Sequence, residues 1–184
     1  MIEGSRILLR PIREEDWQIV EGWGQRREAL WGQFQRFQID HMPLLREAYR
    51  QTGLLSRESG FLLIEVLTQQ QVVGFVRYTL LQFPDADFAY PEIGFGIPEL
   101  SARGRGYGAE AVQLLVKYLW AGYGVERMAA FTDLENTPAQ RVLEKSGFQR
   151  EGVLRRASFR DGRWCDIAVY GTLRQDGKPA EAGG

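Results

Sequence analysis

The stretch Arg103-Gly104-Arg105-Gly106-Tyr107-Gly108 decides the fold that we predict for this chain. It separates an apolar, strand-like run over residues 93–97 from an amphipathic run over residues 109–120. A glycine-rich turn at the start of a helix presents unpaired backbone N–H groups, and the helix dipole favours an anion there. Two arginines add charge that suits a pyrophosphate. A plain surface turn with solvated arginines is equally compatible with this stretch taken alone.

Two downstream motifs narrow the choice: Asn136-Thr137-Pro138-Ala139 and Leu143-Glu144-Lys145-Ser146-Gly147-Phe148. Together with an R-x-x-G-x-G pattern at Arg103, Gly106 and Gly108, they resemble the GCN5-related N-acetyltransferase (GNAT) family, which binds acetyl-CoA. The block from Glu92 to Ala111 resembles the RimJ/RimL-like branch of that family, which acetylates ribosomal proteins and small molecules. The resemblance covers about residues 5–174.

Composition excludes several other classes of protein. The 184 residues include 23 basic and 24 acidic side chains, so a formal net charge of -1 gives nucleic-acid binding no electrostatic support. A single cysteine, Cys165, excludes an internal disulfide and fits a reducing compartment, and with His41 as the only histidine we expect no metal site. We see no signal-peptide-like segment and no apolar run long enough for a bilayer, and therefore expect a cytoplasmic protein without membrane contact.

Hydrophobic periodicity predicts a single α+β domain over residues 1–174, followed by a disordered tail over residues 175–184. The expected strands span residues 6–12, 61–67, 72–83, 88–97, 125–133, 148–159 and 164–173. The expected helices begin at the acidic turn of residues 14–16 and span residues 43–51, 109–121 and 138–145. The resemblance implies a mixed central sheet of about seven strands with four helices, in which strands four and five splay apart and admit the cofactor.

The resemblance also implies the cofactor site. The pyrophosphate of acetyl-CoA would bind the backbone amides of the turn that comprises Arg103, Gly104, Arg105, Gly106, Tyr107 and Gly108. The pantetheine arm would pair with the edge of the fourth strand at Phe95, Gly96 and Ile97, where flanking glycines make a bulge plausible. A backbone amide of that strand would polarise the thioester carbonyl.

Two side chains after the fifth strand extend this site. Asn136 matches the family's asparagine that hydrogen-bonds the cofactor arm, and its alternative role is an N-terminal cap for the helix that starts near Pro138. Arg141 either meets the adenosine phosphate or is solvated.

The catalytic candidates are Glu92 and Asn136. Glu92 lies on the fourth strand, where alternation puts it on the same face as Gly94, and its carboxylate could draw a proton from an ammonium through water. The alternative for Glu92 is a surface glutamate at the start of a strand.

The acid that protonates the leaving thiolate is in doubt. Ala139 and Leu143 occupy positions at which the family often has serine and tyrosine. Water could serve instead, because a thiolate is only weakly basic, or the role could pass to Tyr90, Tyr107 or Tyr170.

The acceptor site is expected to include Glu92 and three aromatic residues, Trp31, Phe34 and Phe37, which alternatively cover the sheet. Asp85 and Asp87 with Glu92 would suit a cationic amine. We therefore predict an acetyl-CoA-dependent N-acetyltransferase that acts in a ternary complex on a primary amine, either a small molecule or a protein N-terminus, and that could form a homodimer. The alternative is a non-catalytic acyl-CoA-binding module with the same fold.

Overall fold

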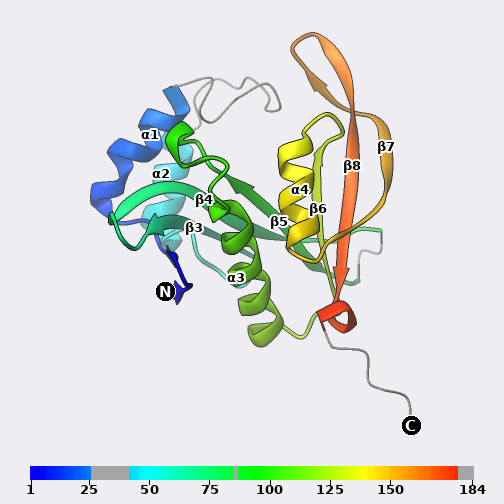
Figure 1. Cartoon of the computed structure of the whole chain (residues 1–184), viewed down its shortest axis with the longest axis horizontal. Helices are drawn as coiled ribbons and strands as arrows, with labels where there is room; N and C mark the ends of the chain where they lie inside the picture. The colour runs from blue at the N-terminus through cyan, green and yellow to red at the C-terminus, as the bar shows by residue number, and fades with distance from the viewer. Residues whose placement is uncertain (26–41, 85–86, 178–184) are drawn as a thin grey trace.

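The computed structural model describes residues 1–25, 42–84 and 87–177 of the chain (Figure 1). Within these residues eight strands form one sheet: β1 (Ile2–Glu3), β2 (Ile7–Arg10), β3 (Ser59–Val66), β4 (Gln71–Leu81), β5 (Tyr90–Gly96), β6 (Arg127–Asp133), β7 (Gln149–Arg160) and β8 (Arg163–Leu173). Their order across the sheet is β1-β2-β3-β4-β5-β6-β8-β7. Neighbouring strands are antiparallel except β5 and β6, which are parallel, so the sheet is mixed.

Four α-helices within the same residues cover the two faces of the sheet: α1 (Trp17–Gln25), α2 (Met42–Thr52), α3 (Tyr107–Gly122) and α4 (Thr137–Lys145). Figure 1 shows α1 and α2 on one face and α3 on the other. Trp17, Val20 and Trp23, which recur at helical spacing, are buried beneath α1 as the periodicity predicts. A larger core cluster joins α3 and α4 to the opposite face, with Leu115 and Leu143 among its members.

The α+β fold expected from the sequence is confirmed, and the structure adds the short strand β1 at one edge. The part of the chain that the structure describes also has three short 3-10 turns: η1 (Glu14–Asp16), η3 (Leu100–Ala102) and η4 (Arg174–Gly177). The first residues of the tail that we expected to be disordered belong to η4, where Asp176 accepts a hydrogen bond from the Leu173 amide at 2.8 Å. The rest of that tail, residues 178–184, lies outside the described residues.

The junction between β5 and β6 divides the sheet into two halves. The parallel register between these strands consists of the pair Glu92 and Ala129. On its other side, β5 pairs with β4 over seven residues without a shift in register. The bulge expected around Gly94 and Gly96 is therefore wrong. The two glycines instead leave room for side chains of β4, because a Cβ on Gly96 would lie 2.9 Å from the Phe75 ring.

A buried ionic network ties β2 to the start of α1 and to β3. The Arg10 guanidinium donates to both carboxylate oxygens of Asp16, at 2.6 and 2.8 Å, and to Glu65 on β3. The Arg10 and Asp16 side chains are each 4% exposed. Burial alone would raise the pKa of Asp16, but the hydrogen bonds from Arg10 and from the Arg13 amide outweigh it and lower the pKa below its usual value.

We expect Asp16→Asn to lower the free energy of unfolding by about 3 kcal/mol at neutral pH, because it removes one partner of a buried guanidinium. Folding lowers the pKa of this carboxyl below its unfolded value of about 3.9. The carboxyl therefore stabilises the native state above the unfolded pKa, and this stabilisation is lost as the pH falls through the lower pKa of the folded state. The difference between mutant and wild type should therefore shrink in acid. Urea unfolding at several pH values measures this, with the exposed Glu47→Gln as a control that should change stability by less than about 1 kcal/mol. A pH-independent difference would contradict this account.

Candidate active site

A cavity of about 520 Å³ lies where β5 and β6 separate. One wall consists of residues from β4 and β5: Phe75, Arg77, Glu92, Ile93, Gly94 and Phe95. The opposite wall comes from β6, α4 and the β7–β8 hairpin, and it includes Asp133, Asn136, Ala139, Leu143, Arg160 and Ile167. The cavity thus lies between the two halves of the sheet.

Side chains from both faces of the sheet line this cavity. Phe75 packs against the cluster of Trp17 and Trp23 on the face that carries α1. Ile93 and Phe95 belong to or pack against the cluster beneath α3, on the other face. Since successive residues of a strand point to opposite faces, a cavity lined by both sets passes from one face to the other through the junction. Two molecules could therefore reach one point from opposite sides.

The glycine-rich turn lies at the N-terminus of α3, as the sequence predicts. Gly106 is the residue that precedes the helix, with φ of 85°, and Gly104 has φ of 73°. Both values lie in the left-handed region that favours glycine. Residues 103–106 are exposed, so the turn that precedes this 16-residue helix is open to a ligand. Arg103 also donates from Nε to the Ile97 carbonyl at 2.8 Å, which ties the turn to the end of β5.

Sequence reasoning missed a clamp from the start of the chain that holds this turn. Glu110, in the first turns of α3, accepts hydrogen bonds from Ser5 Oγ at 3.0 Å and from Arg6 N and Nε at 2.9 Å each. Burial raises the pKa of Glu110, and these bonds more than reverse the effect, so its pKa is lowered. Arg6 also donates to the Arg105 carbonyl at 2.8 Å. No local pattern reveals the clamp, because its partners lie 104 residues apart.

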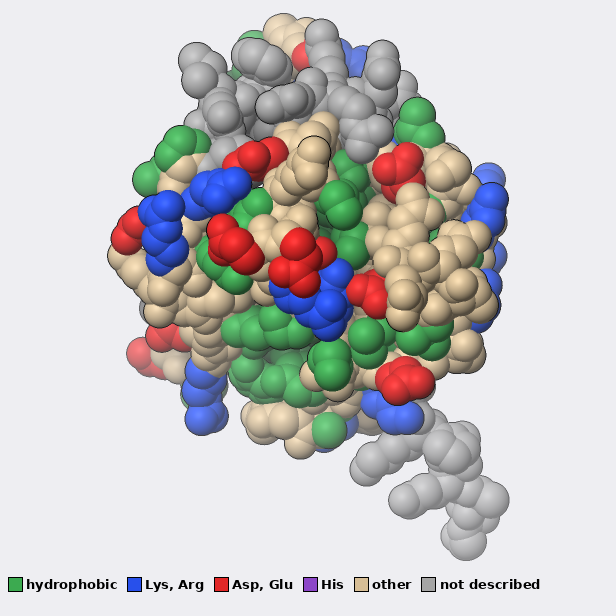
Figure 2. All heavy atoms as spheres, turned by 90° about the vertical axis from the view of Figure 1, so that its left-hand side faces the viewer, with side chains coloured by type: hydrophobic (Ala, Val, Ile, Leu, Met, Phe, Trp, Pro, Cys, Tyr) green, Lys and Arg blue, Asp and Glu red, His purple; other side chains and the backbone are tan. Residues whose placement is uncertain are grey.

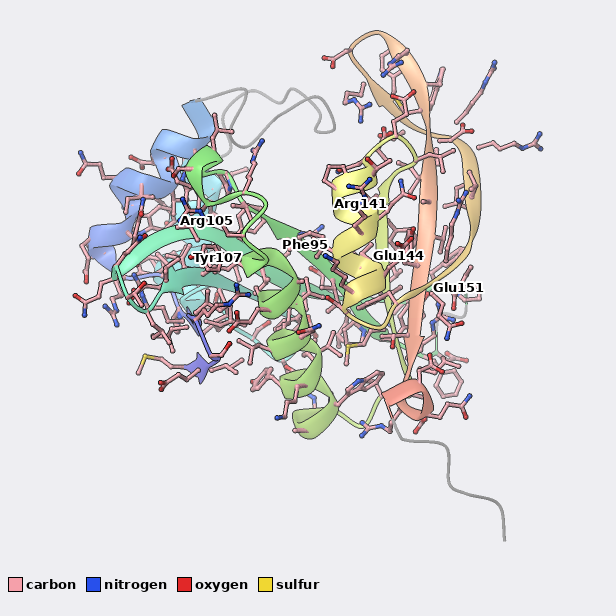
Figure 3. The ribbon with its side chains drawn as sticks, in the orientation of Figure 1. Phe95, Arg105, Tyr107, Arg141, Glu144 and Glu151 are labelled. Atoms are coloured by element: carbon pink, nitrogen blue, oxygen red, sulfur yellow. The ribbon has the colours of Figure 1, made fainter. Side chains whose placement is uncertain are left out.

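Figure 3 shows how the predicted cofactor residues lie around the gap between α3 and α4. Arg105 and Tyr107 lie at the N-terminal end of α3, Arg141 lies on α4, and Phe95 lies between the two helices. Arg141 is exposed. These residues, far apart in the sequence, thus lie around the same two helices, and of the four only Phe95 lines the cavity.

Glu92 lines the cavity, but it is paired. Its carboxylate accepts two hydrogen bonds from Arg77 on β4, at 3.1 and 3.3 Å. Arg77 was not foreseen as a site residue. Its position could have been inferred from strand pairing, since Arg77 lies opposite Gly94 and therefore one alternation from Glu92.

A second ion pair in the cavity wall also escaped prediction. Arg160, near the end of β7, donates to Asp133 Oδ2 at 2.6 Å, and both side chains are only 3% exposed. Asp133 Oδ1 accepts from the Glu135 amide at 2.8 Å. This pair holds the hairpin against the end of β6.

Asn136 has the capping role that we weighed against cofactor binding. Its Oδ1 accepts from the Ala139 amide at 3.2 Å, and the residue also lines the cavity, so capping fixes the side chain there without deciding its role in binding. Leu143 is buried in the core.

The three candidate tyrosines do not line the cavity that the described residues form. The Tyr90 ring lies beneath Arg127 and the Tyr107 ring beneath Arg6. The buried Tyr170 hydroxyl donates to Glu144 at 3.0 Å; burial and this bond raise its pKa.

The remaining candidate residues of the sequence analysis lie outside the cavity lining or outside the described residues. Cys165 is a buried free thiol. Trp31, Phe34 and Phe37 of the expected acceptor site, with His41 and Asp85, lie outside the described residues. Asp87 is not among the residues that line the cavity.

The surface and the described residues as a whole give three further results. On the face in Figure 2, acidic and basic side chains of the described residues lie beside one another instead of forming a patch of one sign. No helix among the described residues is long and apolar enough to cross a membrane. Nor does this part of the chain contain a cluster of three His, Cys, Asp or Glu side chains that could hold a metal ion.

Comparison with known proteins identifies the family. Residues 6–149 match the model of the acetyltransferase (GNAT) domain. The chain is 26% identical over 181 residues to the probable N-acetyltransferase YjcK of Bacillus subtilis, which covers 96% of this chain and 98% of that protein. It is also 29% identical to the uncharacterized N-acetyltransferase p20 of Bacillus licheniformis over 113 residues, 61% of each chain. The protein belongs to the GNAT family and is an N-acetyltransferase.

Solved structures agree with this fold. A spermidine N-acetyltransferase from Vibrio cholerae, in complex with CoA and spermine, superposes with a TM-score of 0.77 at 18% identity, over 94% of this chain and 98% of that one. RimL, the ribosomal L7/L12 α-N-protein acetyltransferase in complex with CoA, gives 0.75 at 17% identity, over 92% and 95%. The family assignment favours an enzyme over the non-catalytic module considered from the sequence.

Proposed function

We propose that this protein transfers an acetyl group from acetyl-CoA directly to a primary amine in a ternary complex. The observation that carries the proposal is the cavity at the β5–β6 junction, because it is lined from both faces of the sheet. Acetyl-CoA would enter from the face of α3 and α4, and the amine from the face of α1. The amine nitrogen forms a bond to the thioester carbonyl carbon, the carbon–sulfur bond breaks, one proton leaves the amine, and the thiolate takes up one proton.

The residues around α3 fit a pyrophosphate-containing ligand. Gly106, in the left-handed conformation, belongs to an exposed turn that precedes α3, where backbone N–H groups and the helix dipole favour phosphate oxygens. Arg105 on this side and Arg141 on α4 would add charge-assisted hydrogen bonds. The clamp of Arg6 and Glu110 supports the turn through the Arg105 carbonyl. The pantetheine arm would then follow β5 at Phe95, Gly96 and Ile97 towards the cavity, with Asn136 donating from its side-chain amide.

Glu92 would receive the proton of the amine, directly or through one water. Its side chain is 19% exposed. Because Arg77 engages both carboxylate oxygens, the acceptor must displace or share that guanidinium before its ammonium reaches Glu92. A backbone amide of β5 near Phe95 would stabilise the developing oxyanion.

We expect acetyl-CoA and CoA to raise the melting temperature, because a ligand that binds only the native state stabilises it by mass action. Gly106→Val should abolish most of this rise. It should also lower the stability of the free protein by about 1–2 kcal/mol, because Gly106 has a left-handed conformation. Gly162→Val is the matched control, since Gly162 has φ of 77° in the β7–β8 turn and a Cβ there would meet no atom within 4 Å. Thermal scans measure these rises. Equal ligand-induced rises in the two variants, or no rise in wild type, would contradict the assignment of this turn to the acetyl-CoA site.

Glu92→Gln should lower turnover at neutral pH by about a hundredfold, a typical loss for a general base, while acetyl-CoA affinity changes little. The wild-type rate should rise with pH as the amine deprotonates, and the mutant should recover in part at high pH. Thiol release across a pH series measures both. Glu151→Gln, which breaks an exposed pair with Arg127 at 2.8 Å, should retain wild-type turnover. A Glu92 mutant that matches wild type at every pH shows that Glu92 is not the base.

We expect no single tyrosine to be essential for departure of the thiolate. A thiolate leaving group with a pKa near the cysteine value of about 8.5 gains little from an acid at neutral pH. Tyr90→Phe, Tyr107→Phe and Tyr170→Phe should each retain activity within about tenfold, or 1.4 kcal/mol of barrier. Tyr170→Phe should in addition lose about 1 kcal/mol of stability, because it removes a buried hydrogen bond. A thousandfold loss of activity with acetyl-CoA binding intact would identify that tyrosine as the acid.

A further inference from the structure

The two ion pairs in the cavity wall differ in burial and in the distance between their charged groups. Arg160 and Asp133 are almost fully buried and 2.6 Å apart. Arg77 and Glu92 are 43% and 19% exposed, and their hydrogen bonds are longer, at 3.1 and 3.3 Å. Solvent-exposed ion pairs contribute at most about 1 kcal/mol, so a ligand can exchange with this partly exposed pair at lower cost than with a buried one. The buried pair instead resists exchange, because separating it would leave a charge without a partner in the interior.

The backbone of β5 leaves room for the Arg77 side chain at the cavity wall. A Cβ at Gly94 would lie 2.6 Å from Arg77 Nε, so the glycine leaves the room in which the Arg77 side chain runs across β5. This course brings the guanidinium to Glu92, within the set of residues that line the cavity. Arg77 is thus placed beside the proposed base and in contact with the space that an acceptor would fill.

Charge balance then constrains the acceptor. The ionisable side chains among the described lining residues are Arg77, Glu92, Asp133 and Arg160, two of each sign. An ammonium that takes Glu92 as its partner would leave Arg77 without one. An acceptor that also carries a carboxylate restores the balance, because a guanidinium binds a carboxylate through two parallel hydrogen bonds.

Resting on the function proposed above, we propose that the acceptor is an α-amino carboxylate, that is, a free amino acid or a close analogue. Its ammonium and carboxylate are separated by one carbon, so they match two side chains that touch each other. The ammonium would replace Arg77 at Glu92 while the carboxylate binds the released guanidinium. Arg77 therefore has two roles: it selects the acceptor, and it frees the base only when an anion is present. A polyamine or a simple amine lacks the group that Arg77 requires.

Matched pairs of amines test this. Thiol release from saturating acetyl-CoA is measured with phenylalanine and 2-phenylethylamine, with tyrosine and tyramine, with spermidine, and with a short peptide that has a neutral N-terminal residue. Each amino acid should exceed its decarboxylated partner at least about tenfold in kcat/KM, mostly through KM, which corresponds to one lost carboxylate contact. Equal values within the pairs, or a preference for spermidine or the peptide, would overturn the inference.

Variants of Arg77 assign the discrimination to that residue. Arg77→Gln should reduce the difference within each pair to less than about threefold, and Arg77→Lys, which retains the charge without the two parallel donors, should give an intermediate value. Arg50→Gln is the matched control, because it breaks an exposed pair with Glu47 at 3.3 Å on α2, and it should leave the discrimination unchanged. Urea unfolding confirms that each variant is folded. Discrimination that survives in Arg77→Gln would refute the role of Arg77.

A binding measurement separates this inference from the proposed function. With CoA present, phenylalanine should raise the melting temperature of wild type more than 2-phenylethylamine does, and Arg77→Gln should remove that difference. If no amine releases thiol but this difference is found, the catalytic proposal fails and the recognition of α-amino carboxylates stands. If amines are acetylated without any difference within the pairs, catalysis stands and the inference fails. If no amine releases thiol and the melting temperatures do not differ, both the catalytic proposal and the inference fail.

Discussion

The position of the active site depends on where the hydrogen-bonded pairing of β5 and β6 stops. Their parallel register consists of Glu92 and Ala129, and beyond it the two halves of the sheet follow separate courses. Backbone groups that a continuous sheet would use for pairing remain at the inner edges of the gap, and a cavity lined from both faces takes the place of a ladder. The larger core cluster, which joins α3 and α4, contains residues of both halves, whereas the cluster beneath α1 contains only residues that precede β5. The active site therefore follows from where pairing stops.

Features with short-range causes could be predicted from the sequence. The apolar spacing of Trp17, Val20 and Trp23 predicts a buried helix face, and these residues are buried. The glycines of residues 104–108 predict a turn at a helix N-terminus, and the left-handed φ of Gly106 has that cause. Such patterns also predict the hairpin at residues 161–162. In each case the information lies within a few neighbouring residues.

Features set by contacts between distant segments could not be predicted in this way. Alternation places Glu92 on one face of its strand, but the side chain that meets it, Arg77, comes from the neighbouring strand. The glycines of β5 are compatible with a bulge in the sequence, whereas in the structure they accommodate side chains of β4, because a missing Cβ can serve either purpose. Likewise, Arg160 and Asp133 meet only after β7 and β8 have folded back beside β6.

The clamp of Ser5 and Arg6 on Glu110 has a consequence for biosynthesis. Residues near the start of the chain emerge from the ribosome 104 residues before the carboxylate that they bind. At 5–20 residues per second, this gap corresponds to roughly 5–20 s of translation. During that interval Arg6 has no helix α3 to hold, so the turn at residues 103–106 takes its final shape only after most of the domain has been synthesised. A nascent chain that ends between the turn and residue 110 therefore lacks the Glu110 carboxylate that binds Ser5 and Arg6.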